Sequence, residues 1–484
     1  MSDSIKQKTF SSVIWKFSER FLAQLVATIV SVILARILMP EDYSVVSITA
    51  IFFAFANILI SGGFNSALIQ KKDADKEDYS SVFVFSLTIS ALSYAVLFVA
   101  APFLARWFHN DELVFFLRVM GLILPILAYK SVICAYISSN LLFKKFFWST
   151  LGGTIVSAFV GILMAINGFG AKALMAQQIT NAIVDTVILS ISTKMPLSFR
   201  VSIQKLKKLL GYGWKIFATS MISNIYVYLN PIVVGIKYQK ADLSFYTKGQ
   251  HFPHLISSNT NYTLSAVLFP VLAKYQDDKE LLLKYTRRFI KTSSYIMFPL
   301  MFGLFAISKK FVCVVLTEKW MPAVPFIRVF CIAYMFEMIH AGNCETIKAM
   351  GRSDLFLKME IIKKASYFLV IFLFIMFTNS PFELAISSIV CTAIAIIVNC
   401  IPNIKLLGYS VKDQFADIFP NFINALIMCF VVLMFDWGLP QNVIVLLLQI
   451  LCGAVVYILL SLITKNENLK YLIMTAKQML GRKT

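Results

Sequence analysis

The sequence predicts an all-α polytopic membrane protein with about fourteen transmembrane helices. Polar loops cut the 484-residue chain into apolar stretches, and roughly 20 apolar residues cross a bilayer as a helix. The composition agrees, because 58% of the residues are hydrophobic and the mean hydropathy is +0.76, well outside the soluble range. The function must therefore be sought in what crosses or lines the membrane.

Short polar segments separate the apolar stretches and set the order of the elements. The chain begins with a polar segment over 1–11. The first span follows directly, without the small-residue cleavage site of a signal peptide, so we expect no removed leader. The expected spans run over 12–38, 44–67, 80–104, 113–138, 149–168, 172–193, 213–236, 245–272, 291–308, 322–347, 365–378, 382–404, 419–435 and 442–463.

Many transporters are built from two related halves, and short matches about 200 residues apart indicate such a duplication here. Trp15 and Lys16 open the first span, and Trp214 and Lys215 open the seventh. Spans thirteen and fourteen stand outside the duplication. The expected organisation is a cytoplasmic N-terminus over 1–11, an N-lobe over 12–193, a linker helix over 194–212, a C-lobe over 213–404, a cytoplasmic loop over 405–418, two spans over 419–463 and an amphipathic tail over 464–484.

Two segments outside the spans are predicted to be surface helices. Ile203, Leu206 and Leu209 share one helical face of the linker, and its lysines lie on the other. This pattern is typical of a helix lying in the membrane interface. We expect the linker to be a flexible tether between the lobes, and the C-terminal tail repeats its pattern.

The net charge of +20 is interpreted as an orientation signal. Most of the 45 Lys and Arg residues fall on the same side of the membrane as the N-terminus, and such a bias marks the cytoplasmic side. Both termini are therefore expected in the cytoplasm. The placement of the charge also argues against a nucleic-acid partner.

The sequence contains no constellation typical of an enzyme or a metal site. Walker A, GxSxG and HExxH patterns are absent, and the eight cysteines include no CxxC pair. We expect no disulfide, no metal site and no cofactor. An ATP-driven pump or membrane hydrolase is not expected, and the protein is predicted not to be an enzyme.

Cations within the spans are candidates for function, because an ionisable group costs a few kcal/mol at the bilayer centre. For most of them the alternative is that the long side chain extends to the interface from a helix end. Lys130 lies deeper than the others and is harder to explain in this way. The five candidate cations for binding an anion are Lys16, Arg20, Lys130, Lys215 and Lys248.

Three other groups in the spans are candidates for ion coupling. Asp185, Glu337 and His340 could carry protons, since a carboxylate in apolar surroundings titrates nearer neutrality. The alternatives are that Asp185 pairs with Lys130 across adjacent helices and that Glu337 and His340, one turn apart, satisfy each other. Whether protons, sodium or substrate synthesis drives the process stays open.

Amide side chains accompany the cations in the spans. A basic, amide-rich lining suits an anionic, hydroxyl-rich ligand, with phosphate oxygens for the cations and sugar hydroxyls for the amides. It suits a lipophilic cation poorly. The amides are Asn57, Asn65, Gln177, Gln178, Asn181, Asn224, Asn230, Asn259 and Asn261.

Five short segments, within residues 12–410, follow the pattern of one known family. They are 34–44 (LARILMPEDYS, with Ser44 in place of the family's usual glycine), 63–70 (GFNSALIQ), 267–278, 318–325 and 348–354. In these segments the chain resembles the bacterial polysaccharide, or Wzx-type, flippases of the MATE-like MOP superfamily, in the branch of colanic-acid and teichuronic-acid exporters. The motif residues are expected to serve turns and loops.

The resemblance implies two pseudo-symmetric six-helix bundles with two extra C-terminal helices, in the bacterial cytoplasmic membrane. It also implies the activity, in which an undecaprenyl-pyrophosphate-linked oligosaccharide repeat crosses the membrane by alternating access for exopolysaccharide, capsule or O-antigen biosynthesis. The five candidate cations would then offer charge to the pyrophosphate. A polymerase and the chain-length machinery are the expected protein partners, and a monomer is the expected state.

Two other functions compete with this one. A MATE-type cation-coupled multidrug antiporter shares the fold, but it would need carboxylates facing its cavity. A non-transporting membrane scaffold would tolerate the loss of every intramembrane charge. Within the leading class, a lipid II flippase stays possible but would be essential for viability. The identity of the oligosaccharide stays open.

Overall fold

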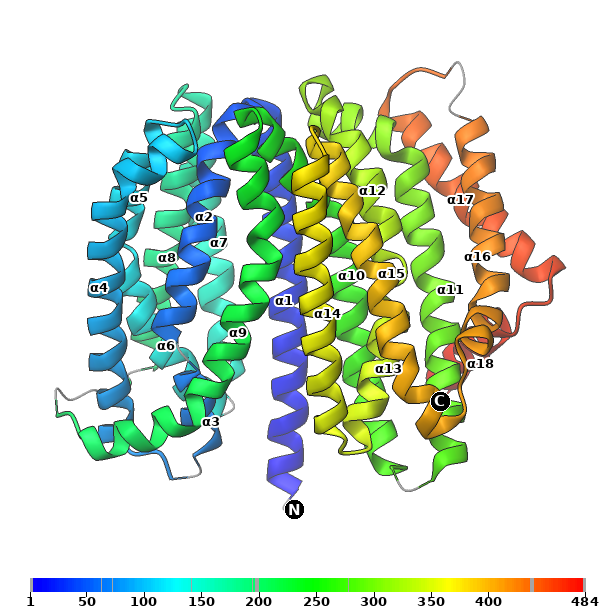
Figure 1. Ribbon diagram of the computed structural model, residues 1–484, viewed down its shortest axis with the longest axis horizontal. Helices are drawn as coiled ribbons and strands as arrows, with labels where there is room; N and C mark the ends of the chain where they lie inside the picture. Colours follow the sequence, from blue (N-terminus) through cyan, green and yellow to red (C-terminus); the bar gives the residue numbers. More distant parts are fainter. Residues whose placement is uncertain are drawn as a thin grey trace. The chain divides into compact units, whose positions relative to one another are not determined.

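The computed structural model is built of helices throughout the part of the chain that it describes (Figure 1). It describes residues 3–61, 63–71, 73–140, 142–193, 195, 200–276, 278–435 and 439–481. The chain divides into two compact units, one over residues 1–244 and the other over 245–484.

Unit 1 contains the helices that position the candidate site. They are α1 (Asp3–Ile37), α2 (Pro40–Ser61), α3 (Phe64–Gln70), α4 (Lys76–Trp107), α5 (Glu112–Gly121), α6 (Leu124–Ser139), α7 (Phe143–Ile166), α8 (Ala171–Thr193), α9 (Ile203–Lys237) and the start of α10 (Lys240–Lys274).

Unit 2 continues with α10 and the remaining elements. They are α11 (Lys279–Phe311), the short π-helix η1 (Val312–Leu316), the 3-10 helix η2 (Glu318–Ala323), α12 (Val324–Tyr334), α13 (Glu337–Ala349), α14 (Ser353–Phe377), α15 (Pro381–Leu407), α16 (Val411–Met434), α17 (Val443–Ile463) and α18 (Glu467–Gly481).

The expected count of fourteen spans is not confirmed, although helices form at all fourteen positions. Among the described residues, eleven spans are long and apolar enough to cross a membrane, or twelve with the bent pair α5–α6. The other two positions hold α10 and α14. These helices are long enough, but α10 carries a polar stretch over 257–261, and α14 carries Glu360, Lys363 and Lys364.

The prediction of one span over 113–138 needs correction, because this segment forms two helices and not one. The axes of α5 and α6 are bent by 42° at the break between them. Pro125 occupies the first turn of α6, where its missing N–H is tolerated but its ring prevents continuation of the preceding helix.

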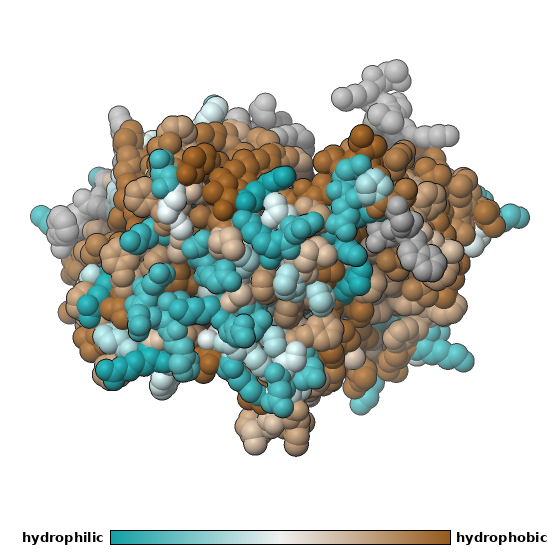
Figure 2. Space-filling view, turned by 90° about the horizontal axis from the view of Figure 1, so that it is seen from above, coloured by the Kyte–Doolittle hydropathy of each residue, from teal (hydrophilic) through white to brown (hydrophobic). Residues whose placement is uncertain are grey.

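The surface agrees with a membrane environment. On the face shown in Figure 2, groups of hydrophilic residues lie beside groups of hydrophobic residues. Large apolar side chains are highly exposed on the helices, including Ile191 (70%), Ile463 (75%) and Phe377 (82%). Lipid is the natural environment for such side chains.

Within unit 1 the most extensive helix contact is between α7 and α8, and small residues make it possible. A Cβ on Gly161 would lie 2.9 Å from Cβ of Gln177, and one on Gly153 would lie 2.8 Å from Cβ of Asp185. Close approach of this kind is how membrane helices gain packing energy without a hydrophobic drive. The α7–α8 contact is therefore fixed by glycine.

A buried carboxylate joins two helices of unit 2. Asp417 on α16 accepts hydrogen bonds from Nε and Nη2 of Arg287 on α11, both at 2.8 Å, and from the Tyr409 hydroxyl at 2.8 Å. Lys291 lies 3.2 Å from the same carboxylate. The first of the two extra C-terminal spans is thereby tied to α11.

The segment expected to be a flexible tether is docked on unit 1. It forms the first turns of α9, which packs on α2, α3 and α4. Leu206, Leu209 and Leu210 join an apolar cluster with Phe64 and Tyr79. The leucines of the linker's apolar face are therefore turned toward protein, whereas Ile203 at its start is 66% exposed.

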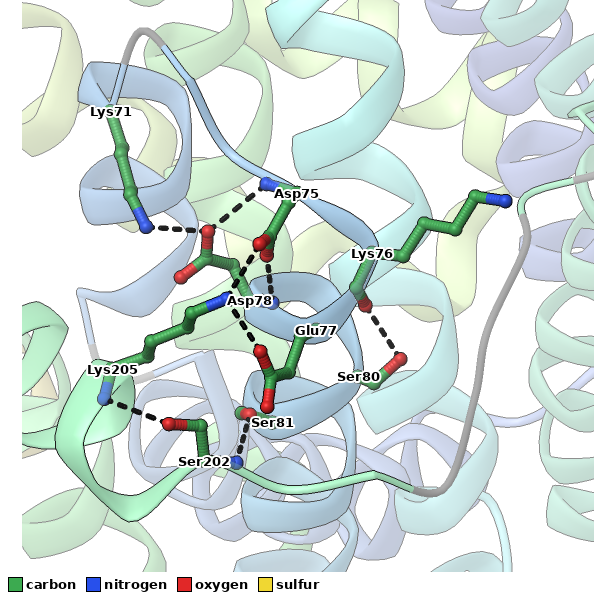
Figure 3. A network of polar contacts seen from close by, with 9 residues as sticks. All are labelled: Lys71, Asp75, Lys76, Glu77, Asp78, Ser80, Ser81, Ser202 and Lys205. Carbon is green, nitrogen blue, oxygen red and sulfur yellow. Dashed lines mark hydrogen bonds and ion pairs between the residues drawn. The ribbon is translucent and has the colours of Figure 1, made fainter.

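Charged contacts complete this docking (Figure 3). Nζ of Lys205 lies 2.5 Å from Asp75 and 2.6 Å from Glu77. The hydrogen bond from Lys205 holds the pKa of Asp75 well below its usual range. Asp75 also caps α4 in a reciprocal capping box with Asp78, and Lys71 lies 2.5 Å from Asp78. The start of α4 and the start of α9 are thus joined by one polar network.

Replacing Gly161 with leucine is expected to destabilise the fold by about 1–3 kcal/mol, because the added side chain overpacks the α7–α8 contact. The apparent melting temperature of purified protein in detergent should fall accordingly. Gly211→Leu is the matched control, since nothing lies within 4 Å of a Cβ there. Equal melting temperatures for the two variants would contradict this packing.

Lys205→Gln is expected to loosen the start of α9. Hydrogen exchange of the amides over 202–210 should become a few-fold faster, as measured by mass spectrometry. Lys76→Gln is the control, because the Lys76 ammonium points away from the acidic residues in Figure 3.

The same docking should depend on pH with a defined sign. The pKa of Asp75 is lowered by Lys205, so its contribution is present above the ordinary carboxyl pKa of about 4 and is lost as the pH falls below it. The protection factors of the amides over 202–210, which allow for the slower intrinsic exchange in acid, should therefore fall below that pH in the wild type and change less in Lys205→Gln.

Candidate functional site

Unit 1 contains a cavity of about 430 Å³ between α1, α2, α6, α7 and α8. One cation and several amide and hydroxyl groups line it, within a largely apolar wall. The lining residues are Ala27, Ser31, Leu34, Tyr43, Val46, Leu127, Lys130, Thr154, Ser157, Leu174, Gln177, Gln178, Asn181 and Ala182.

The cation of the cavity is Lys130, which α6 supplies. Its Nζ donates to Oδ2 of Asp185 on α8 at 2.5 Å. The Lys130 side chain is 27% exposed and that of Asp185 is 7% exposed. The two residues thus form the ion pair that the sequence offered as an alternative, with the lysine at the cavity and the carboxylate behind it.

The ion pair leaves hydrogen-bonding capacity unused. An ammonium has three donors, and Asp185 is the one protein partner of Lys130 among the described residues. Oδ1 of Asp185 is buried and has no hydrogen-bond partner among the described residues. Lys130 can therefore hold an anion in the cavity while it keeps its contact with Asp185.

Helical spacing explains how the neutral polar groups reach the cavity. Thr154 and Ser157 are three residues apart on α7, and Gln177 and Asn181 are four apart on α8, so each pair shares one helical face. Nδ2 of Asn181 donates to Oγ of Ser157 at 3.3 Å. The predicted amides Gln177, Gln178 and Asn181 are therefore brought together with the predicted cation Lys130.

The other candidate cations do not line this cavity among the described residues. Arg20 is half-buried on α1, and Lys215 is exposed on α9. Lys16 also belongs to α1, but its side chain lies outside the described residues. Lys248 is buried on α10, with its Nζ 5.5 Å from the ring centroid of Trp320.

Glu337 and His340, the two ion-coupling candidates in unit 2, each bond to a different residue and not to each other. Glu337 accepts a hydrogen bond from the Ser257 hydroxyl, and a ring nitrogen of His340 contacts the Asn399 amide. No hydrogen bond or ion pair joins Glu337 to His340 in the part of the chain that the structure describes. The mutual pairing considered from their spacing is therefore not formed there.

A group of metal-ligand types in unit 2 was missed in the sequence. Ligand atoms of His340, Cys344 and Glu360 lie within 4.8 Å of one another. His340 and Cys344 lie one turn apart on α13, but Glu360 comes from α14, so no short spacing reveals the group of three. Nζ of Lys363 lies 2.5 Å from Glu360, and this positive charge disfavours a metal cation at the same carboxylate.

The first family-like segment, 34–44, has a structural role and one contact with the site. Oδ2 of Asp42 accepts from the Met39 amide at 2.9 Å, and Oδ1 accepts from the Ala171 amide at 3.1 Å. Asp42 thereby joins the starts of α2 and α8, as expected of a turn residue. The neighbouring Tyr43 lines the cavity, which sequence reasoning missed.

Solved structures show the fold. A structure of the lipid II flippase MurJ in an inward closed conformation superposes with a TM-score of 0.76 at 17% identity, covering 93% of this chain and 98% of that one. An inward-facing MATE family transporter has a TM-score of 0.61 at 13% identity, covering 82% and 100%. The expected MATE-like fold is confirmed.

Curated relatives match over nearly the whole chain. A protein of Klebsiella pneumoniae described as an uncharacterized membrane protein in the cps region is 26% identical over 477 residues, with 96% of each chain covered. The succinoglycan biosynthesis transport protein ExoT of Rhizobium meliloti is 25% identical over 462 residues, with 92% of this chain and 91% of that protein covered.

The family is shown by a match that spans more than half of the chain. Residues 33–325 fit the family described as polysaccharide biosynthesis protein. This range includes α2, α6, α7 and α8, which line the cavity, and most of the segments that suggested the resemblance. The chain belongs to the polysaccharide biosynthesis protein family.

Proposed function

We propose that this multi-pass membrane protein is a flippase, which moves an undecaprenyl-pyrophosphate-linked oligosaccharide across the cytoplasmic membrane by alternating access. The observation that carries the proposal is the cavity of unit 1, where Lys130 stands among amides and hydroxyls. Membership of the polysaccharide biosynthesis family supports it. The protein would act as a transporter and not as an enzyme, with both termini in the cytoplasm.

The chemistry of the cavity fits the two parts of such a head group. The Lys130 ammonium can form charge-assisted hydrogen bonds to phosphate oxygens, which are stronger than neutral ones. Gln177, Gln178 and Asn181 offer both donors and acceptors, as sugar hydroxyls require. Because Asp185 holds the lysine in place, less side-chain entropy is lost when a ligand binds.

The multidrug antiporter is less well supported by the same cavity. A site for an organic cation needs a carboxylate at its surface, but here the surface carries the lysine, and the carboxylate of Asp185 is 7% exposed. The lining charge therefore has the sign that suits an anion.

Other parts of the proposal rest on the sequence alone. Coupling to H⁺ or Na⁺ through Asp185, Glu337 or His340 is one of them. Roles for Lys16, Arg20, Lys215 and Lys248 at the pyrophosphate are another. A monomeric state and a partnership with a polymerase and the chain-length machinery complete the list.

Deletion of the gene is expected to cause accumulation of one lipid-linked repeat and loss of one surface polymer. Mass spectrometry of undecaprenyl-linked glycans and an assay of surface polysaccharide would show both effects. If glycans and polymer were unchanged, in a strain without a redundant homologue, the antiporter would become the better assignment. Drug resistance on overexpression would test that assignment.

Complementation of the deletion strain tests Lys130 directly. Lys130→Gln should lower polymer export roughly 10- to 100-fold, because it removes a hydrogen bond to a charged group worth about 1.5–3 kcal/mol. Lys130→Arg should retain most of the export. The control is Lys207→Gln, which changes an exposed lysine on α9. If Lys130→Gln, present in the membrane at the same level, exported as much polymer as the wild type, Lys130 would not belong to the binding site.

A further inference from the structure

The counter-ion of Lys130 is placed in the wall of the cavity. Asp185 is not among the residues that line the cavity, and its side chain is 7% exposed against 27% for Lys130. The 2.5 Å contact between them means that an anion bound to Lys130 has a second anion directly behind the ammonium.

Close packing against α7 also holds Asp185 in its position. The α7 backbone approaches so closely that a Cβ on Gly153 would lie 2.8 Å from Cβ of Asp185 and 3.2 Å from its Cα and backbone nitrogen. Asp185 therefore has little freedom to withdraw when an anion enters. The Oδ1 of this carboxylate is buried without a hydrogen-bond partner among the described residues, so Lys130 is the one group in that part of the chain that compensates its negative charge.

This arrangement answers two physical demands at once. A lysine in the membrane without a counter-ion is costly. A desolvated lysine without one would also hold a pyrophosphate very tightly, because Coulomb attraction is strong at low dielectric. A transporter must release what it binds. A carboxylate fixed behind the cation lowers the cost of placing the lysine in the membrane, and it weakens the binding of the anion enough to allow release.

We propose that Asp185 sets the strength with which Lys130 holds the anionic head group, and that its repulsion allows the head group to leave. The proposal rests on the proposed function, because it concerns the same cavity and the same pyrophosphate. Asp185 acts on the ligand through Lys130 and is a positioning residue. If Asp185 served only to hold Lys130 in place, removing its charge would weaken the binding of the head group and not tighten it.

The test uses the full-length protein in phosphatidylcholine nanodiscs, with undecaprenyl pyrophosphate as the probe. The dissociation constant and the dissociation rate are measured for the wild type and for Asp185→Asn. We expect binding about tenfold or more tighter and dissociation slower by a similar factor, since one like charge near the ligand has gone. The same variant should export less polymer in the deletion strain, and Asp185→Glu, which keeps the charge, should restore wild-type release.

Unchanged or weaker binding by a stably folded Asp185→Asn would overturn the proposal. Should that variant not fold, Lys130→Gln is compared with the double variant Lys130→Gln/Asp185→Asn, in which both groups are neutral amides. The double variant must bind the probe more tightly than Lys130→Gln, and equal affinities would overturn the proposal in the same way.

This experiment distinguishes an error in the proposed function from an error in the role of Asp185. If the proposed function is wrong, the wild type does not bind the probe and none of the variants changes that. If only the role of Asp185 is wrong, the wild type binds the probe, Lys130→Gln weakens it, and Asp185→Asn fails to tighten it.

Discussion

The membrane requires that a charge within it be paired, and the Lys130–Asp185 ion pair is how unit 1 meets this requirement. The pair joins α6 to α8 at 2.5 Å, and Gly153 lets α7 pack closely against the backbone and Cβ of Asp185. The cavity exists where these three helices meet α1 and α2. The chemistry of the site therefore follows from the same contacts that hold the helices together.

A second buried carboxylate shows what a structural ion pair looks like in this protein. Asp417 accepts bonds on both oxygens, from Arg287 and from the Tyr409 hydroxyl, and Lys291 lies beside it. Little capacity is left for a ligand. The pair in unit 1 has one cation, one filled carboxylate oxygen and a cavity beside the ammonium, so its polar groups are available to a ligand in a way that those around Asp417 are not.

Much of the fold could be predicted from the sequence, because hydrophobic length and basic loops reflect the bilayer itself. The cost of a buried charge singled out Lys130 and Asp185, which are 55 residues apart, but only the fold decided that they pair. Thr154 and Ser157 were missed as site residues because a Ser or Thr hydroxyl in a membrane helix can bond to its own backbone and so signals little. The docking of the linker was missed because an apolar helical face fits lipid and protein equally well.

The central claim is that the cavity of unit 1 receives the head group of the transported lipid. The most direct measurement is photo-crosslinking in polymer-producing cells, with benzoylphenylalanine placed on α8 either at Gln178, which lines the cavity, or at Ile191, which is 70% exposed on the same helix. The account predicts a glycolipid adduct that carries the sugar at position 178 and none at 191. Sugar-bearing adducts at neither position, or equally at both, would contradict it.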